Sequence, residues 1–297
     1  MRDAAFLYIH AITPVHAGSG TALGHVDLPI QRERHTQWPI VPGSSLKGIL
    51  RQDLKGPLEP DLILDLFGPE RDGDARDHAG ALSVSDARIL AFPVRSLVGV
   101  FAWATCPAVL ERFARDAALV GLQPPEDGSD YAGLRPGEAY APAESPLRVD
   151  RDHLLLEDLE FAVRGPTGPL PAWLAEAVTS DPATRARLAR HLVVLSDDDF
   201  SHFARNATEV TARIGLDAET KTVAGGALFY EEFLPSESLL YALVRAARSR
   251  RPDGVLDGGT LLTRVAGALP KVLQIGADET IGKGFCAVRL ALAGEGR

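Results

Sequence analysis

Cysteine is scarce in this sequence of 297 residues, which contains only Cys106 and Cys286, far apart in the chain. Neither belongs to a C-x-x-C pair, so the spacing excludes the common structural zinc sites. A disulfide scaffold is not needed, because a chain of this length buries roughly 75% of its unfolded surface. We therefore expect a reducing, cytoplasmic setting.

Long apolar runs are also lacking. No stretch reaches the ~18 consecutive apolar residues of a membrane-spanning helix, so no membrane contact is expected. The opening MRDAAFLYIHAIT carries charge at positions 2 and 3 and a short apolar run. This pattern predicts a first strand over residues 4–13 and not a signal peptide.

Common enzyme motifs are missing as well. The stretch GADETIGKG at 276–284 is not a Walker A loop, because its first gap is too long and Gly284 replaces the hydroxyl residue that binds magnesium. No G-x-S-x-G elbow occurs. The absence of a cofactor motif argues against an enzyme of small-molecule metabolism.

Positive charge is sparse overall but concentrated in one place. The net charge of −9 argues against a nucleic-acid-binding protein. However, residues 28–51 hold four cations and a single acid, Glu33. The acids gather in runs at 125–130, 157–160, 196–199 and 230–232, where solvated faces are the ordinary expectation. The distribution predicts a basic site on an acidic body.

Hydrophobic spacing predicts the main elements. A helix capped by Ser44 or Ser45 should run to about residue 54, with a buried stripe at Leu46, Ile49, Leu50 and Leu54. Strands are expected at 80–87 and 98–105, helices at 107–118, 181–195 and 259–270, a hairpin at 207–235, and strand–glycine loop–strand at 271–292. Residues 124–171 contain eight of the 21 prolines and are expected to be irregular and outside the core.

Strands and helices therefore alternate, with long insertions between them. This order is typical of an α+β domain with a ferredoxin-like βαββαβ centre.

Three segments carry residues suited to chemistry, and each has a plain structural alternative. PGSSLKG (42–48) is either an anion site at a helix start or an ordinary capped helix. The loop at 276–284 either lets its amides approach phosphates or forms a simple turn. Asp27, flanked by His16, His25 and His35, is either a turn residue or a group for metal binding or proton transfer.

The stretch HAGSG…LGHVDLPIQRERHTQWPIVPGSSLKGILR resembles the signature region of the RAMP superfamily. More narrowly, it is similar to the repeated backbone subunit of the type III-B CRISPR effector, the Cmr complex. Further similar stretches follow in the same order: LFGPE (66–70), GALSVSDARILAFPVRSLVGVFAWATCP (80–107), VVLSDDDFSHFARNATEVTARI (193–214), KTVAGGALFYEEFLP (221–235) and QIGADETIGKGFCAVRL (274–290). The resemblance spans nearly all of a single RAMP domain over 1–297, with a poorly matched proline-rich insertion at 124–175.

The resemblance implies a ferredoxin-like palm, similar to an RNA-recognition motif, and a thumb hairpin at 205–232. It implies that copies of the chain form a filament along a guide (CRISPR) RNA and capture complementary single-stranded target RNA. The other implied partners are Cmr subunits: the small subunit, the large polymerase-like subunit and the capping RAMP subunits.

The resemblance also implies site residues. The family's catalytic aspartate maps to Asp27, which would bind Mg²⁺ or another divalent cation during cleavage of target RNA by the 2′-hydroxyl. Weaker implied helpers are His16, Tyr230 and Glu231. The implied RNA contacts are Arg32, Ser44, Ser45, Lys47, Arg51, Gly282 and Lys283.

Two other functions stay open at this point. One is a non-catalytic scaffold that holds guide RNA in a filament. The other is a guide-processing endoribonuclease that uses histidine as a general base without metal.

Overall fold

This computed structural model describes residues 3–70, 78–125, 131–216 and 223–293. The strands are β1 Ala4–Ala11, β2 Ile40–Val41, β3 Leu82–Val84, β4 Ala87–Arg95, β5 Phe101–Thr105, β6 Glu138–Tyr140, β7 His153–Leu156, β8 Leu159–Gly165, β9 Leu192–Leu195, β10 Glu209–Leu216, β11 Val223–Phe233, β12 Leu239–Ala246, β13 Val272–Gln274 and β14 Phe285–Leu292. The helices are α1 Gly43–Leu54, α2 Pro60–Phe67, α3 Pro107–Leu119, α4 Leu170–Val178, α5 Pro182–His191, α6 Asp197–Asn206 and α7 Gly258–Ala268, with short 3₁₀ turns at Tyr131–Gly133 and Glu279–Ile281. The mixed α+β class is confirmed.

One long mixed sheet runs through the molecule in the order β13-β14-β1-β12-β4-β5-β9-β6-β8-β7, with β2 beside β4 and β3 beside β12. Strand β1 pairs antiparallel with both β12 and β14. All eight residues of β1 are buried, because α7 contacts this strand as well as α4. The strand predicted at 4–13 is thus confirmed, but it is apolar on both faces.

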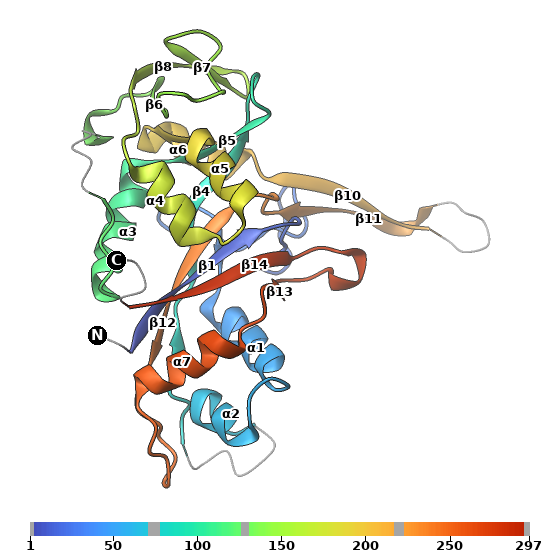
Figure 1. The fold of residues 1–297 in the computed structure, drawn as a ribbon. Helices are drawn as coiled ribbons and strands as arrows, with labels where there is room; N and C mark the ends of the chain where they lie inside the picture. Colours follow the sequence, from blue (N-terminus) through green and yellow to red (C-terminus); the bar gives the residue numbers. More distant parts are fainter. Residues whose placement is uncertain (1–2, 71–77, 126–130, 217–222, 294–297) are drawn as a thin grey trace.

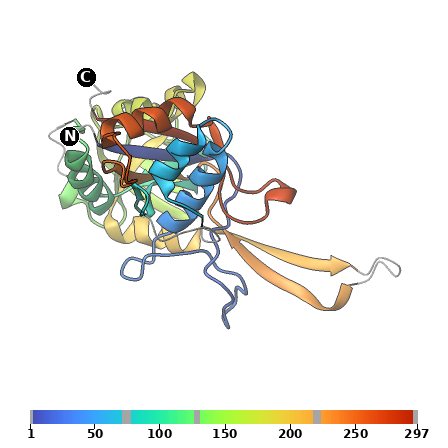
Figure 2. The same ribbon diagram turned by 90° about the horizontal axis from the view of Figure 1, so that it is seen from below.

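The hairpin of β10 and β11 forms a separate ribbon that projects from the body (Figure 1). Its strands pair antiparallel, as the β-branched pattern of 207–235 predicts. Residues 217–222, between the two strands, lie outside the described residues. Seen from below, the loop that follows β1 leaves the body beside the base of the hairpin (Figure 2).

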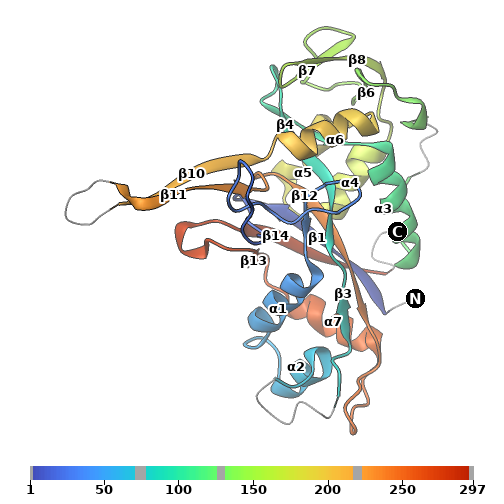
Figure 3. The ribbon, with the colours of Figure 1, turned by 180° about the vertical axis from the view of Figure 1, so that it is seen from behind.

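The proline-rich segment is more ordered than expected. Strands β6, β7 and β8 continue the main sheet beyond β9, and Leu154, Leu156 and Phe161 are almost fully buried. The view from behind shows these strands capping the end of the molecule above α6 (Figure 3). The expectation of an irregular segment outside the core is therefore wrong. Strand β6 pairs with β9, so this segment gains backbone hydrogen bonds even though its many prolines have no N–H group to donate.

The helix predicted over 181–195 is shorter than expected, because its last four residues form a strand. Helix α5 ends at His191, and the apolar run Leu192–Leu195 forms β9, which pairs parallel with β5. The tertiary partner overrides the helical spacing of the preceding residues.

Helix α1 begins differently from the prediction, although its buried stripe is confirmed at Leu46, Leu50 and Leu54. Neither Ser44 nor Ser45 caps it. The carboxylate of Asp86 instead accepts the N–H of Gly43 at 2.8 Å. None of the helices in the described ranges is long and apolar enough to cross a membrane.

Candidate functional site

Asp27 is bound directly to the base of the hairpin. One carboxylate oxygen, Oδ2, accepts the N–H of Tyr230 at 2.7 Å, while the Tyr230 carbonyl accepts the N–H groups of Asp27 and Leu28 at 3.1 and 3.0 Å. The Leu28 carbonyl in turn accepts the N–H of Glu232 at 3.0 Å. The loop between β1 and β2 (residues 12–39) therefore pairs with β11 through an isolated bridge, and Asp27 lies against the backbone of Tyr230.

His16 and Glu231 also meet, but within a buried charged cluster. The Nδ1 atom of His16 lies 2.7 Å from the Glu232 carbonyl and 3.6 Å from Glu231 Oε1. The other Glu231 oxygen pairs with Arg213 at 2.9 Å, and Arg213 also pairs with Asp278. Burial, followed by the negative charge of Asp278, raises the pKa of Glu231. This cluster joins the loop, the hairpin and the C-terminal glycine loop.

Arg32 has a structural role that the sequence does not reveal. Its guanidinium contacts Glu232 at 2.5 Å and donates to the carbonyls of Gln37 and Ala204 at 2.7 and 2.9 Å. The second oxygen of Glu232 accepts the N–H of Ile30 at 3.0 Å. The side chain of Arg32 is only 16% exposed. Arg32 therefore holds the loop against the hairpin and α6, and its geometry does not favour contact with an external ligand.

A pocket of about 270 Å³ lies where the three segments singled out in the sequence meet. The first loop contributes His16, Ala17, Gly18, Gly20 and Leu28; the start of α1 contributes Val41, Pro42 and Ser45; the glycine loop contributes Gly276 and Ala277. Gly276 has φ +91°, and a Cβ there would lie 2.4 Å from the His16 carbonyl. Only glycine fits this close approach of two backbones.

The start of α1 presents polar and cationic groups to solvent. Ser44 and Ser45 are exposed, and Lys47 is half-buried. Burial, followed by the positive charges of Arg250 and Arg51, lowers the pKa of Lys47. Arg250 is exposed and forms no ion pair within the described residues. Helix α1 and the segment after β12 thus share one patch of positive charge, which suits a polyanion.

Arg51 belongs to this patch but is partly engaged. One of its nitrogens donates to the Gly68 carbonyl at 2.9 Å and lies 3.9 Å from a carboxylate oxygen of Glu70. Glu70 itself is exposed and lies closer to Lys55, at 2.7 Å. A ligand phosphate would therefore compete with a weak, solvent-screened contact.

The glycine loop places Lys283 over the ring of Phe233, with 4.7 Å between the ammonium nitrogen and the ring centroid. Gly282 has φ +77° and follows the 3₁₀ turn. Because Phe233 ends β11, this cation–π contact fixes the glycine loop beside the hairpin base. Gly282 and Lys283 therefore lie at the site, with Lys283 partly used by the fold.

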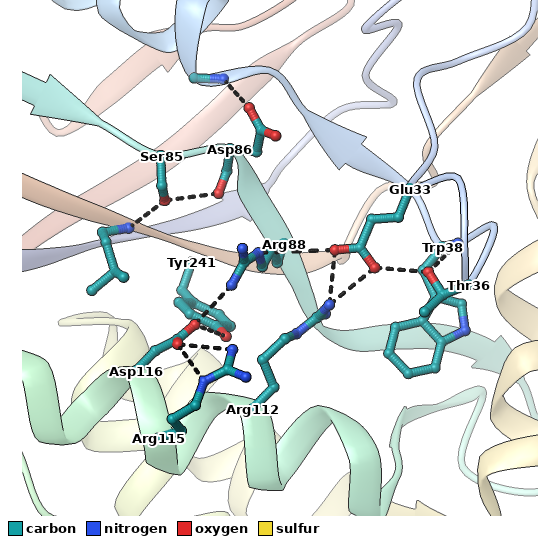
Figure 4. Close-up of polar contacts among 12 residues, drawn as sticks. Glu33, Thr36, Trp38, Ser85, Asp86, Arg88, Arg112, Arg115, Asp116 and Tyr241 are labelled. Carbon is teal, nitrogen blue, oxygen red and sulfur yellow. Dashed lines mark hydrogen bonds and ion pairs between the residues drawn. The ribbon is translucent and has the colours of Figure 1, made fainter.

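A second buried network anchors the far side of the first loop (Figure 4). Arg112 of α3 contacts both carboxylate oxygens of Glu33, at 2.8 and 2.9 Å. Arg88 of β4 lies 3.8 Å from Glu33 and 3.0 Å from Asp116, which also accepts the hydroxyl of Tyr241 at 3.0 Å. Two residues before Arg88 in the chain, Asp86 holds the start of α1. Strand β4 thus sets the position of the loop relative to α1.

The donor set at Asp27 is too small for a resident metal ion. No group of three His, Cys, Asp or Glu suited to a metal lies among the residues that the structure describes. Oδ1 of Asp27 has no protein hydrogen-bond partner within the same residues. Mg²⁺ often binds through one or two carboxylates plus substrate phosphates, and this arrangement fits the site.

Several residues of the site were not found by sequence reasoning. Arg213 and Asp278 lie at the centre of the buried cluster, and Arg250 extends the patch on α1. The acidic run at 230–232 was expected to face solvent, yet Glu231 and Glu232 are 4% and 7% exposed. The alternation of polar residues along β10 was the one available signal for Arg213, whereas Asp278 required knowledge of the loop geometry.

Similarity to known proteins is extensive. A sequence model of the RAMP superfamily matches residues 8–287. The chain is 38% identical over 288 residues to the CRISPR system Cmr endoribonuclease Cmr4 of Pyrococcus furiosus, covering 95% of this chain and 94% of that protein. It is 26% identical over 304 residues to the CRISPR system CMR subunit Cmr4 of Saccharolobus solfataricus, with 95% and 94% covered.

Solved structures agree with the sequence matches. The crystal structure of oligomeric Cmr4 from Pyrococcus furiosus superposes with a TM-score of 0.74 at 30% identity, covering 98% of each chain. A chain of the type III-B Cmr-beta complex bound to cognate target RNA gives 0.73 at 20% identity, covering 97% and 96%, and supports the fold alone. Because both the family model and a relative of 38% identity cover nearly its whole length, this chain belongs to the RAMP superfamily.

Proposed function

We propose that this chain is the backbone subunit of a type III-B CRISPR ribonucleoprotein and an endoribonuclease that cleaves target RNA within it. The observation that carries this proposal is the attachment of a solitary carboxylate, Asp27, to the base of a protruding hairpin. The relative named as a Cmr endoribonuclease supports the same activity. The proposed partners are guide RNA, target RNA, further copies of this chain and the other Cmr subunits.

We assign the ferredoxin-like palm to β1, α1, β4, β12, α7 and β14. Its support is the antiparallel order β14-β1-β12-β4. Counted along the chain, the first and fourth palm strands are neighbours, and the third lies between the first and the second. Two strand–helix–strand units, β1-α1-β4 and β12-α7-β14, are joined by the segment between β4 and β12 and give the βαββαβ order. The insertions between β4 and β12 carry the hairpin.

The hairpin is assigned as the thumb. Because side chains alternate across a ribbon, Val210, Ala212, Ile214, Leu228 and Tyr230 share one face. Four of them are large and 43–54% exposed, which is unusual for a ribbon without a protein partner. An apolar face of this kind can enter a stack of base pairs, losing some stacking while bending the nucleic acid. We propose that it displaces a guide–target base pair.

The basic patch on α1 is assigned to the guide backbone. Its contacts would be Ser44, Ser45, Lys47 and Arg51, with Arg250 added from the structure and Gly282 and Lys283 from the glycine loop. Base pairing would then determine sequence specificity, while the protein binds phosphates and duplex geometry. Arg32 is left out, because its guanidinium is used within the fold.

The chemistry assigned to Asp27 follows from its contacts. The Tyr230 N–H fixes Oδ2, so the carboxylate presents Oδ1 to a strand lying across the hairpin base. That oxygen can accept the proton of an attacking 2′-hydroxyl or hold a cation beside the phosphate. A divalent cation held by Asp27 and phosphate oxygens would neutralise charge developing at phosphorus. His16 and Glu231 are buried, so we assign them to positioning of the loop.

The test replaces Asp27 by asparagine in the assembled complex with guide RNA. Asparagine keeps an oxygen that can accept the Tyr230 N–H, so the loop geometry is retained while the charge is lost. We expect cleavage to slow by about 10²–10⁴-fold while target binding is unchanged. The matched control is Asp198→Asn, an exposed acid on α6, which should cleave like the unaltered protein.

Equal cleavage by both variants would disprove the role of Asp27. The competing function is a non-catalytic scaffold that holds guide RNA. That function would be supported if even the unaltered complex bound target RNA without cutting it in Mg²⁺. Cleavage that persists in EDTA would point to the metal-free histidine mechanism.

A further inference from the structure

We propose that a pocket between β1, β14 and α4 binds a phosphate monoester attached to a flat ring, with a nucleoside monophosphate as the fitting class. The pocket has a volume of about 560 Å³, within the range of ~300–1,000 Å³ that small-molecule sites occupy. None of its lining residues belongs to the loop after β1, to α1 or to the hairpin. It is therefore separate from the proposed RNA site.

The topology explains how the pocket forms. Tyr8 and Arg289 stand directly opposite each other on β1 and β14, so their side chains share one face of the sheet. Ring contacts from Tyr8 to Phe113 and from Phe113 to Trp173 show that this face lies under α3 and α4. Arg185 of α5 completes the wall of the pocket.

Two guanidinium groups give the pocket its anion preference. Arg289 Nη1 donates to the carbonyls of Glu176 and Ala177, each at 2.6 Å, and Arg185 Nε donates to the Thr179 carbonyl at 2.6 Å. These bonds hold both side chains at the C-terminal end of α4 and leave their other N–H groups available. Neither arginine forms an ion pair within the described residues. Two fixed guanidinium groups suit a phosphate monoester, which carries nearly two negative charges.

A buried hydroxyl and an indole ring supply the remaining recognition. Tyr8 lines the pocket, and its buried hydroxyl has no hydrogen-bond partner among the described residues. A buried donor left unpaired is costly, so an acceptor arriving from the pocket would relieve it. Trp173 is half-buried and offers a flat apolar wall for a ring. Glu176, exposed at the rim, disfavours a second anionic group there.

Binding of AMP to the purified full-length chain tests the proposal, with calorimetry as the readout. Adenosine and ribose 5-phosphate, which each lack one half of the recognised structure, should bind at least about tenfold more weakly. Arg185→Gln should weaken AMP binding about tenfold or more, because it removes a charged hydrogen bond. Tyr8→Phe, which deletes only the hydroxyl, should weaken it about threefold to tenfold.

Two controls locate the bound nucleotide. Arg190→Gln, an exposed arginine on the same helix as Arg185 but outside the pocket, should bind AMP like the unaltered chain. Lys47→Gln, in the proposed RNA site, should also leave AMP binding unchanged. The proposal is overturned if AMP does not bind, or if Lys47→Gln weakens binding while Arg185→Gln does not. It is equally overturned if the pocket variants alter only self-association, because the pocket would then be a contact between copies.

Discussion

The ion pair between Glu33 and Arg112 allows a quantitative test of how the first loop is held. The two side chains are 10% and 12% exposed, and both Glu33 oxygens contact the guanidinium. Removing one partner of a buried pair costs roughly 3–5 kcal/mol, because the other charge stays buried without compensation. The Thr36 hydroxyl still donates to Glu33 at 2.7 Å, so we expect the lower end, about 3 kcal/mol, for Arg112→Met.

Urea unfolding followed by tryptophan fluorescence measures this loss. The double variant Glu33→Gln with Arg112→Met should lose less stability than Arg112→Met alone, since no buried charge is left unpaired. The matched control is Arg115→Met on the same helix, where an arginine 67% exposed should contribute about 0–1 kcal/mol. A loss below about 1 kcal/mol for Arg112→Met would refute the reasoning, because the pair would then be no more than a surface contact.

The same pair predicts a pH dependence. Burial acts to raise the pKa of Glu33, but hydrogen bonds from Thr36 and Arg112 outweigh it, and the pKa lies below its ordinary 4.5. A carboxyl with a lowered pKa stabilises the fold above its unfolded pKa, and this contribution is lost as the pH falls through the folded value. The stability difference between the unaltered chain and Glu33→Gln should therefore be full at neutral pH and shrink below about pH 4.5.

Three further predictions concern the glycine loop, α1 and the hairpin. Gly276→Ala should lower the stability of the fold by about 1–3 kcal/mol in thermal melts, because a side chain there meets a backbone carbonyl at a φ of +91°. The control Gly267→Ala, within α7 and with open space around it, should stabilise the fold by about 0.4–1 kcal/mol. Lys47→Gln should lower the log–log salt slope of single-stranded RNA binding by about 0.7, measured by fluorescence anisotropy; an unchanged slope would remove Lys47 from the contact set. Replacing Ile214 and Leu228 together by serine should change stability by less than about 0.5 kcal/mol, as both are over half exposed, yet slow target cleavage in the assembled complex; normal cleavage would refute the wedge.

The elements that depend on local signals were predictable from the sequence. Pro107 begins α3, the stripe on α1 is buried, and the β-branched run around residues 209–233 forms a hairpin. Segments decided by distant partners were not. Residues 192–195 look helical in sequence but become a strand beside β5, and the proline-rich segment gains order from β9.

The residues of the site also separate into those that the sequence indicates and those that depend on distant partners. Asp27 and Tyr230 meet as the family resemblance implies, and the serines of α1 lie exposed beside Lys47. Which charged side chains remain free to bind a ligand depends on contacts between distant parts of the chain. Nothing near Arg32 in sequence reveals that Glu232 pairs with it, and nothing near Arg213 reveals Asp278. A basic segment in sequence can therefore overstate the charge available to a ligand.

The hydrogen bonds that join Asp27 and Leu28 to β11 have a geometric consequence for repeated copies of the chain. A ribbon that carries its own carboxylate cannot shift along a duplex without moving that carboxylate by the same amount. Under the proposed function, the distance from the displaced base pair to the scissile bond is set inside each protomer, independently of its neighbours. In the proposed filament, successive cuts would therefore be separated by the spacing between protomers, whatever the sequence of the target RNA.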